Sequence, residues 1–271
     1  MIIIGEKING AIPSIKEAIA RRDENLIIER TKAQADAGAD YLDCAPSTST
    51  DVEYETMVWL IGLMQGATEV PLCIDSPNAS LLARIIEEGH VNKPGMVNSV
   101  NEEGTKCETI FPLIAGTDWN VIGLTCDQGG IPYDTQKKID IAKRIIDKAD
   151  HYGVKLSNLH IDPCVMALAT LPSALEDFQA CIRGIHEYAP EVKLTGAISN
   201  ISFNMPARKY INMGCLAYAL EAGLDSAILD PCNADMRSII YACDALTEKD
   251  KSGRKYNRAY RQGKLGIQMK K

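Results

Sequence analysis

Short apolar runs alternate with longer amphipathic stretches along most of this 271-residue chain. Runs of three to five residues have the length of a buried strand, whereas the stretches between them show the spacing and the end signals of helices. Eight runs are predicted to form strands: 2–4, 41–44, 71–75, 96–99, 121–125, 159–162, 194–198 and 226–230. Eight stretches are predicted to form helices: 25–37, 51–66, 78–88, 106–115, 134–152, 173–188, 208–222 and 233–246.

This order of elements predicts an α/β protein with a single (β/α)8 TIM barrel. Parallel strands need crossover connections, and eight strand–helix units close a barrel in about 250 residues. The alternative is an open doubly wound sheet, which is expected to carry a G-x-G-x-x-G fingerprint after its first strand. The sequence at that place is Gly5-Glu6-Lys7-Ile8-Asn9-Gly10, which lacks this pattern. The barrel is therefore favoured.

Charge divides the chain into two parts. Residues 248–271 carry nine Lys and Arg side chains and two acidic ones, a net charge of +7, although the whole chain has a formal net charge of −7. We therefore predict a barrel over residues 1–247, with a net charge of −14, followed by a basic C-terminal extension over residues 248–271. Such an extension indicates contact with the body, with another subunit or with an anionic partner, and the alternative is a solvated terminus.

Composition excludes several classes of protein. No apolar run approaches the ~18 residues that a membrane span needs, and the acidic balance argues against nucleic acid as a partner. The nine cysteines include no C-x-x-C pair, and the chain does not begin with the apolar region of a signal peptide. These features predict a cytoplasmic protein with reduced, mostly buried thiols and without a structural metal site.

Polar residues end most of the predicted strands, and the carboxyl ends of the strands surround the active site of a TIM barrel. They are Asp43, Asp75, Asn98, Ser99, Thr125, Asp162, Ser199, Asn200 and Asp230. Asp75, Asn98 and Asp162 precede the next helix by several residues, which argues against the alternative role of helix caps. Since Lys7 and Arg208 are the only bases near strand ends, a bare phosphate is not the expected ligand. Mg²⁺, Ca²⁺ or a neutral ring with adjacent N–H donors, such as a pterin, fits the oxygen-rich set.

Seven sequence blocks, in order over about residues 2–245, resemble the methyltetrahydrofolate:corrinoid methyltransferase family, whose members have a pterin-binding TIM barrel. The blocks are Ile3-Ile4-Gly5-Glu6-Lys7-Ile8-Asn9-Gly10, Leu72-Cys73-Ile74-Asp75-Ser76, Val97-Asn98-Ser99, Ile122-Gly123-Leu124-Thr125, Ile131-Pro132, Ile161-Asp162-Pro163 and Gly196-Ala197-Ile198-Ser199-Asn200-Ile201-Ser202. The chain length is similar to that of the stand-alone methylcorrinoid:tetrahydrofolate enzymes of methyl-donor (glycine betaine type) demethylation. Dihydropteroate synthases share the barrel, but the basic motifs of their sulfa and pyrophosphate sites are not evident here.

The resemblance implies roles for eight residues around a folate. It implies that Asp75, Asn98 and Asp162 hold the pterin ring. It makes Asn200 the catalytic residue, placed against N5, the atom that gives or takes the methyl group. The remaining substrate-binding residues are Gly196, Ser199, Ser202 and Arg208, the last at the aminobenzoyl-glutamate end.

The resemblance also implies the reaction. A methyl group moves between a protein-bound methylcorrinoid and N5 of tetrahydrofolate, in the direction that forms 5-methyltetrahydrofolate. None of the four histidines lies in a D-x-H-x-x-G motif, so the cobalamin is expected on a separate corrinoid protein; the resemblance further implies a homodimer. The alternative is transfer from methyltetrahydrofolate to a corrinoid iron-sulfur protein in acetyl-CoA synthesis. Alternatives of another class are a non-catalytic folate-binding protein and a Mg²⁺-dependent lyase that uses the strand-end aspartates.

Overall fold

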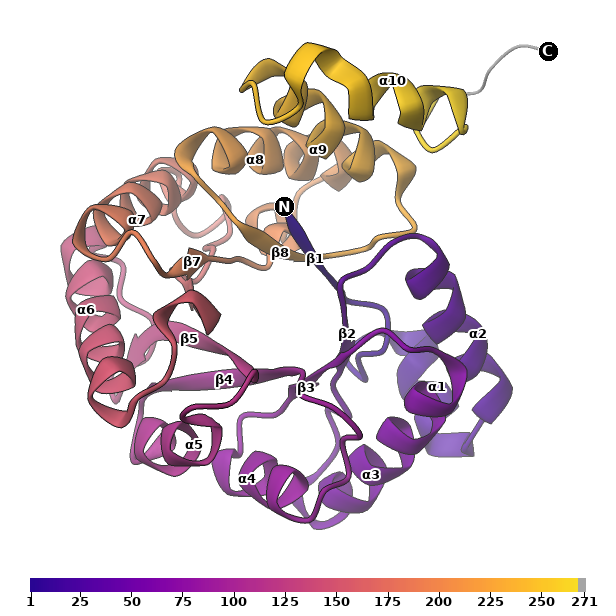
Figure 1. Ribbon diagram of the computed structural model, residues 1–271, viewed down its shortest axis with the longest axis vertical. Coiled ribbons are helices and arrows are strands. Elements are labelled where there is room, and N and C mark those ends of the chain that lie inside the picture. The colour runs from indigo at the N-terminus through magenta and orange to yellow at the C-terminus, as the bar shows by residue number, and fades with distance from the viewer. Residues whose placement is uncertain (268–271) are drawn as a thin grey trace.

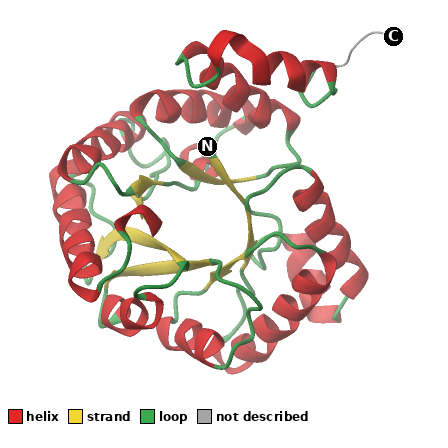
Figure 2. Cartoon of the chain, viewed as in Figure 1, coloured by secondary structure: helices red, strands yellow, loops and turns green. Residues whose placement is uncertain are grey.

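The computed structural model describes residues 1–267, in which a ring of eight parallel strands is surrounded by helices (Figure 1, Figure 2). The strands are β1 (Ile2–Gly5), β2 (Tyr41–Cys44), β3 (Leu72–Asp75), β4 (Met96–Glu102), β5 (Asn120–Asp127), β6 (Leu159–Asp162), β7 (Lys193–Leu194) and β8 (Ser226–Leu229). They are paired in the order β7-β6-β5-β4-β3-β2-β1-β8. The ring closes between β8 and the end of β7, where the Ile228 N–H donates to the Gly196 carbonyl at 3.1 Å. The prediction of a single (β/α)8 barrel is confirmed.

Helices connect the strands on the outside of the ring (Figure 2). The helices are α1 (Pro13–Arg21), α2 (Glu24–Asp36), α3 (Thr50–Ala67), α4 (Ala79–Glu87), α5 (Lys106–Ile114), α6 (Thr135–Tyr152), α7 (Ala174–Tyr188), α8 (Arg208–Ala222), α9 (Ala234–Leu246) and α10 (Arg254–Arg261). Three short 3₁₀ helices are η1 (Leu156–Asn158), η2 (Ile198–Ser202) and η3 (Lys251–Gly253). In the described residues, no helix combines the length and the apolar character needed to cross a membrane.

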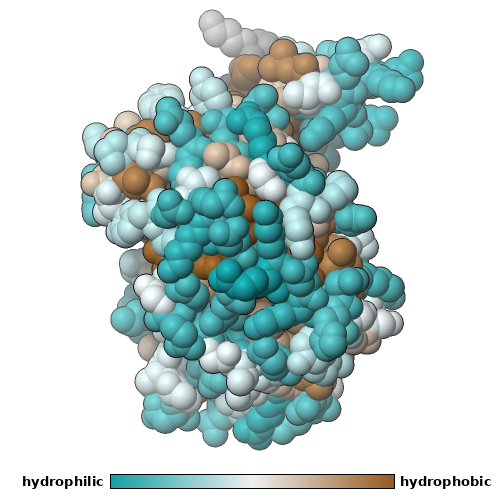
Figure 3. Space-filling view, turned by 90° about the vertical axis from the view of Figure 1, so that its left-hand side faces the viewer, coloured by the Kyte–Doolittle hydropathy of each residue, from teal (hydrophilic) through white to brown (hydrophobic). Residues whose placement is uncertain are grey.

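Apolar side chains form two layers because successive residues of a strand point to opposite faces. Inside the ring, Ile4, Cys73, Met96 and Ile122 are fully buried and contact one another. The neighbouring Ile3 points outward and joins the larger core between the strands and the helices. Seen from the side of α6 and α7, the outer surface is mostly hydrophilic, with only small hydrophobic patches (Figure 3). The strands are thus buried on both faces, as parallel strands usually are.

Besides α10 and longer β4 and β5 strands, two elements differ from the sequence prediction. Residues 13–21 form α1, which was not predicted; Pro13 begins it, and Ile15, Ala18 and Ile19 bury one short face. The predicted strand 194–198 is shorter, because the chain leaves the sheet after Ala197 and turns into η2. There the 3₁₀ spacing of Ile198 and Ile201 buries both side chains. The early end of β7 places the η2 segment across the carboxyl end of the barrel.

The basic extension folds back onto the outer side of α9, as α10 (Figure 1). Ala259 and Leu265 are buried, and the Gly266 N–H donates to Ser238 Oγ on α9 at 2.9 Å. At the start of the extension, the Asp250 carboxylate accepts two backbone N–H bonds of 2.9 Å each. The described part of the extension therefore contacts the body of the protein, and residues 268–271 of the predicted extension lie outside the described residues.

Candidate functional site

A cavity of about 1120 Å³ opens at the carboxyl ends of the strands. Each of the eight strands contributes to its wall, through its own residues or through the loop that follows it. Six of the eight residues singled out in the sequence lie on this wall: Asp75, Asn98, Asp162, Ser199, Asn200 and Arg208. The barrel topology brings them together although they are distributed over more than 130 positions of the chain. This position is where TIM-barrel enzymes place their active sites.

The strand register places the three predicted ring-holding residues on β3, β4 and β6, within four consecutive strands of the ring. Asp75 on β3 lies directly beside Asn98 on β4, and Leu124 on β5 lies beside Asp162 on β6. Asn98 and Asp162 are only 8% and 5% exposed, although both are polar. Two carboxyl groups, at the ends of β3 and β6, and an amide from within β4 thus line the cavity, where the strand backbone fixes their positions.

Burial changes the proton affinity of the acids on β2 and β3. Desolvation, together with the charge of nearby Asp75, raises the pKa of Asp43 well above its usual range. Desolvation, followed by the charge of Glu53, raises the pKa of Asp75 to about 7. Within the described residues, the buried Oδ1 of Asp43 has no hydrogen-bond partner. An unpaired buried polar atom is costly, so Asp43 favours a polar ligand, to which it can donate when protonated and from which its carbonyl-type oxygen can accept an N–H.

Asp162 on β6 is held by its own loop. Its Oδ1 accepts the backbone N–H of Cys164 at 2.7 Å. Desolvation raises the pKa of Asp162 to about 6, and the rise is limited by the Cys164 N–H, by the positive charge of Lys138 and by the Ala197 N–H. At pH 7 the carboxylate form therefore predominates, which can accept two parallel N–H bonds from a ring edge.

The η2 segment carries Ser199 and Asn200 onto the wall and connects them to Arg208. The guanidinium of Arg208 donates to the Ser199 carbonyl at 2.7 Å and to Ser202 Oγ at 2.9 Å. It lies 5.0 Å from the centre of the Phe203 ring. Since the start of α8 and η2 are joined in this way, the position of Asn200 is tied to that of Arg208.

Gly196 and Ser202 are not on the cavity wall, although the resemblance gives them to the substrate. Ser202 is fully buried, and its hydroxyl orients Arg208. A Cβ at Gly196 would lie 2.7 Å from Cζ of Phe178, so glycine is needed here for close packing of the chain against α7. Both residues therefore stabilise the conformation of the η2 segment from the side that faces away from the cavity.

Several wall residues were missed because β4 and β5 continue beyond their predicted ends. The register between these strands shifts after Asn98, and the pair continues to Glu102 and Asp127. The extension brings Asn101 and Cys126 onto the wall, joined by a hydrogen bond of 3.0 Å, and Lys106 follows at the start of α5. The apolar Val100 and Cys126, each just beyond a predicted strand end, were the signals that could have revealed this continuation.

Charge is unevenly distributed between the inside and the edge of the cavity. The acids at its strand ends, such as Asp43 and Asp162, are buried, whereas the wall bases are more accessible and, apart from Arg208, each contacts a carboxylate. These ion pairs are Lys7–Asp230 at 3.1 Å, Lys106–Glu103 at 2.7 Å and Lys209–Asp235 at 2.5 Å. Among residues 1–267, no carboxylate lies in ion-pair contact with Arg208, which remains available to an anionic ligand.

A closed parallel barrel with buried carboxyl and amide groups around one deep cavity defines a TIM-barrel enzyme site for a polar ring. The chain belongs to the pterin-binding enzyme family, since the family model matches residues 8–230. The resemblance seen in the sequence is thus confirmed at the level of the family, and the chain is an enzyme.

Three known proteins illustrate the range of similarity. The methylcorrinoid:tetrahydrofolate methyltransferase of Eubacterium limosum is 44% identical over 268 residues, which cover 98% of each chain. The methionine synthase of Mycobacterium tuberculosis is 32% identical over 244 residues, which are 84% of this chain but only 20% of that protein. A dihydropteroate synthase structure from Xanthomonas albilineans with 4-aminobenzoic acid has a TM-score of 0.68, with 92% of each chain covered. At 16% identity, this last likeness shows the fold alone.

Proposed function

We propose that the protein is a methyltransferase that moves a methyl group from a protein-bound methylcorrinoid to N5 of tetrahydrofolate, forming 5-methyltetrahydrofolate. The observation that carries this proposal is the 44% identity, over 98% of both chains, to a protein with this named activity. The cavity supports it independently, since its buried acceptors match the N–H donors of a pterin edge. The proposed direction follows the name of that relative.

The pterin ring is held by side chains from three strands, β3, β4 and β6. The carboxylate of Asp162 accepts the adjacent N–H donors of the ring, while Asn98 offers a donor and an acceptor together. Asp75 has a pKa of about 7 and can therefore bind the ring either as an acceptor or as a proton donor. Arg208, the wall base without a carboxylate contact among the described residues, receives the glutamate carboxylates at the accessible end of the cavity.

Asn200 acts on N5. Tetrahydrofolate carries a hydrogen on N5, and this hydrogen leaves as a proton when N5 takes up the methyl group. The amide of Asn200 accepts a hydrogen bond from a protonated N5 and donates one to a neutral N5, so it can orient the atom at both stages. Because Asn200 does not need to change its own charge, its effect is positional and electrostatic.

The corrinoid, which supplies the methyl group, belongs to a separate protein in this proposal. A corrinoid is commonly ligated by a histidine, and none of the four histidines of this chain lies on the cavity wall. His160 is fully buried in the barrel, where its Nδ1 contacts Ser226 Oγ at 2.7 Å and burial lowers its pKa to about 3. The open carboxyl end of the barrel, with the exposed side chains of Ile131, Tyr133 and Phe203 around it, is the proposed docking face.

We further propose a cytoplasmic homodimer. An apolar hollow of about 260 Å³ lies between α8 and α9 and includes Tyr218 and Leu246, which are 58% and 83% exposed. Exposed apolar side chains next to such a hollow favour a subunit contact. The nine cysteines are free thiols and seven are buried, as expected of small apolar side chains in a reducing compartment.

The test mixes the protein with methylcob(III)alamin and tetrahydrofolate under anaerobic conditions and follows the cobalamin spectrum together with 5-methyltetrahydrofolate. Equal amounts of demethylated cobalamin and methylated folate are expected. Tetrahydrofolate binding without any methyl exchange, with free cobalamin or with a corrinoid protein, would instead indicate a folate-binding protein. Loss of activity on treatment with a chelator would indicate the Mg²⁺-dependent alternative.

A further inference from the structure

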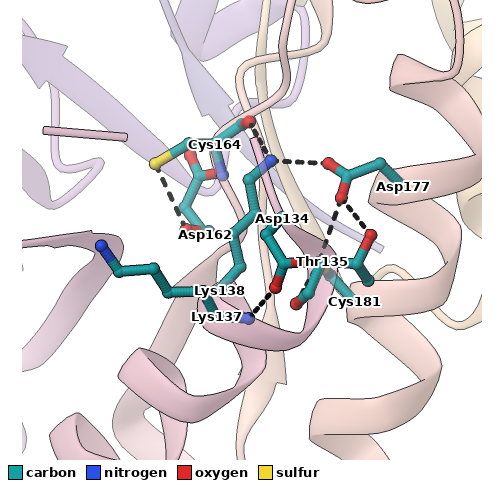
Figure 4. A network of polar contacts seen from close by, with 8 residues as sticks. All are labelled: Asp134, Thr135, Lys137, Lys138, Asp162, Cys164, Asp177 and Cys181. Carbon is teal, nitrogen blue, oxygen red and sulfur yellow. Dashed lines mark hydrogen bonds and ion pairs between the residues drawn. The ribbon is translucent and has the colours of Figure 1, made fainter. Parts of the chain in front are cut away.

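A buried ion pair lies directly behind the cavity, between the first turns of α6 and α7 (Figure 4). Lys138 Nζ is 2.6 Å from Asp177 Oδ2, and the two side chains are 0% and 5% exposed. The second carboxylate oxygen of Asp177 accepts the hydroxyl of Thr135 at 2.6 Å. Lys138 and Asp177 are 39 positions apart and neither lies on the cavity wall. A buried pair of this kind contributes little to stability compared with apolar packing, so its presence calls for another explanation.

Lys138 also contacts the loop that holds Asp162. Its ammonium donates to the carbonyl of Cys164 at 3.3 Å, while the N–H of the same residue donates to Asp162 Oδ1 at 2.7 Å (Figure 4). Cys164 has a φ of 59°, in the left-handed region that residues other than glycine rarely adopt. This conformation turns the N–H of Cys164 toward the carboxylate and its carbonyl toward Lys138. The backbone of Cys164 is thus held at its carbonyl by the Lys138 ammonium and at its N–H by the Asp162 carboxylate.

We propose that Lys138 is a positioning residue for the folate site: anchored by Asp177, it fixes the Cys164 peptide and keeps Asp162 in place as a carboxylate. The inference rests on the proposed function, because it concerns how Asp162 holds the pterin. It adds a residue that does not touch the substrate and that the strand-end pattern does not include. The positive charge of Lys138 is also among the influences that hold down the pKa of Asp162.

The charged and titratable groups around Asp162 come from each neighbouring element. Lys138 faces it from α6, with Asp177 of α7 behind. Cys164 of its own loop and Cys126 of β5 are thiols, and burial raises the pKa of both. From η2 the contribution is the backbone N–H of Ala197. Lys138 is therefore the one cation in this group whose removal is expected to shift the protonation of Asp162.

The test measures the dissociation constant of tetrahydrofolate between pH 5 and 9 for the full-length protein. The wild type is expected to lose affinity as the pH falls through about 6, the pKa of Asp162, and Asp162→Asn is expected to bind weakly without this transition. Lys138→Met is expected to move the midpoint up by about one pH unit. The affinity of this variant should therefore be about threefold lower than that of the wild type at pH 6.5, and nearly equal to it at pH 8.5.

Two further variants keep the test decisive. Lys138→Met leaves Asp177 buried without its partner, so the neutral pair Lys138→Met/Asp177→Asn is measured beside it and is expected to show the same upward shift. Lys155→Met, which removes an exposed ion pair with Asp118 at the opposite end of β5, is the control and is expected to keep the wild-type midpoint.

The outcomes separate the two proposals. A shift of the affinity midpoint to higher pH in both Lys138 variants supports the positioning role. An unchanged midpoint, or an equal loss of affinity at every pH, overturns it and leaves the folate site intact. A wild-type protein that binds no tetrahydrofolate at any pH overturns the proposed function and this inference with it.

Discussion

At the scale of the residue, the site places charged and amide groups where they bind a ligand at the expense of stability. The types of Asp75, Asn98 and Asp162 and their positions directly after apolar runs could be predicted from the sequence, because a polar residue that follows an apolar run can be recognised in the sequence itself. The role of Lys138 could not, because a lysine on an amphipathic helix is usually solvated. Its burial depends on Asp177, which only the packing of α7 against α6 supplies.

Asn200→Ala tests the residue that we place against N5. The amide stabilises the reacting atom and is not one of the strand-end groups that hold the ring, so the rate of methyl transfer should fall about 100-fold or more while the dissociation constant of tetrahydrofolate changes less than about threefold. Single-turnover kinetics and equilibrium binding give the two quantities separately. A variant with wild-type turnover would show that the assignment to N5 is wrong.

Asp162→Asn tests how far the buried carboxylate lowers the stability of the folded protein. Since folding raises the pKa of Asp162 to about 6 from its ordinary 3.8, the folded state favours the protonated form. The contribution of Asp162 to the free energy of unfolding is therefore largest below pH 3.8, where the residue is protonated in both states. It declines as the pH rises through about 6, where the folded state must also lose the proton. Without ligand, the variant should therefore be more stable than the wild type at pH 7.5, by about 1–3 kcal/mol, with the difference vanishing near pH 4.

Thermal unfolding at several pH values measures this difference. Asparagine keeps a carbonyl oxygen for the Cys164 N–H, so the loop contact is retained. The exposed Asp36→Asn at the end of α2 is the matched control, because no burial penalty applies there. A pH-independent difference between Asp162→Asn and the wild type would contradict the explanation.

At the scale of the element, the periodic pattern predicted strands and helices well where they are long and regular. It failed at α1, a second helix between β1 and β2 beside the predicted α2, and at β7, where two paired residues are followed by a 3₁₀ turn. It also ended β4 too early, because the register shift after Asn98 interrupts the alternation of inward and outward side chains. Each failure lies near the carboxyl ends of the strands, where irregular backbone shapes the cavity.

Gly196→Ala tests the close packing that follows β7. The added Cβ would lie 2.7 Å from Phe178 and 3.3 Å from Val165, so α7 or η2 must move, at a cost of about 1–3 kcal/mol. Gly62→Ala in α3 is the control, since no atom lies within 4 Å of its added Cβ and alanine favours the helix. Chemical denaturation should show destabilisation of the first variant and slight stabilisation of the second. Equal stabilities would contradict the packing argument.

At the scale of the whole molecule, an acidic barrel carries a basic helix on its outer side. The sequence showed the division of charge, but not that α10 would pack against α9, because the apolar contacts are few and involve Ala259 and Leu265. Among residues 248–267, no Lys or Arg is in ion-pair contact with an acid of the body. The contact is therefore made by the apolar side of the extension and by the backbone N–H groups of Asp250 and Gly266, which donate to Asp244 O and Ser238 Oγ on α9.

Truncation before Lys249 tests the extension. It removes the packing on α9 and should lower the melting temperature by a few degrees, about 1–2 kcal/mol, while the barrel still unfolds in one transition. Transfer from free methylcob(III)alamin should change less than about twofold, because no residue beyond Met236 lines the cavity in the described part of the chain. Leu265→Ser is the milder companion variant. A large loss of transfer to free tetrahydrofolate would place the extension in the site.

The buried carboxyl groups on one side and the guanidinium of Arg208, which has no carboxylate partner among residues 1–267, on the other give the cavity a polarity. A molecule that is neutral and rich in N–H donors at one end and anionic at the other is attracted in one orientation and repelled in the other. The charge distribution therefore selects the orientation of an incoming ligand before any specific contact forms. We expect folate to enter with its pterin ring leading. A pterin that carries a carboxylate on the ring itself should be excluded, even though its size is suitable.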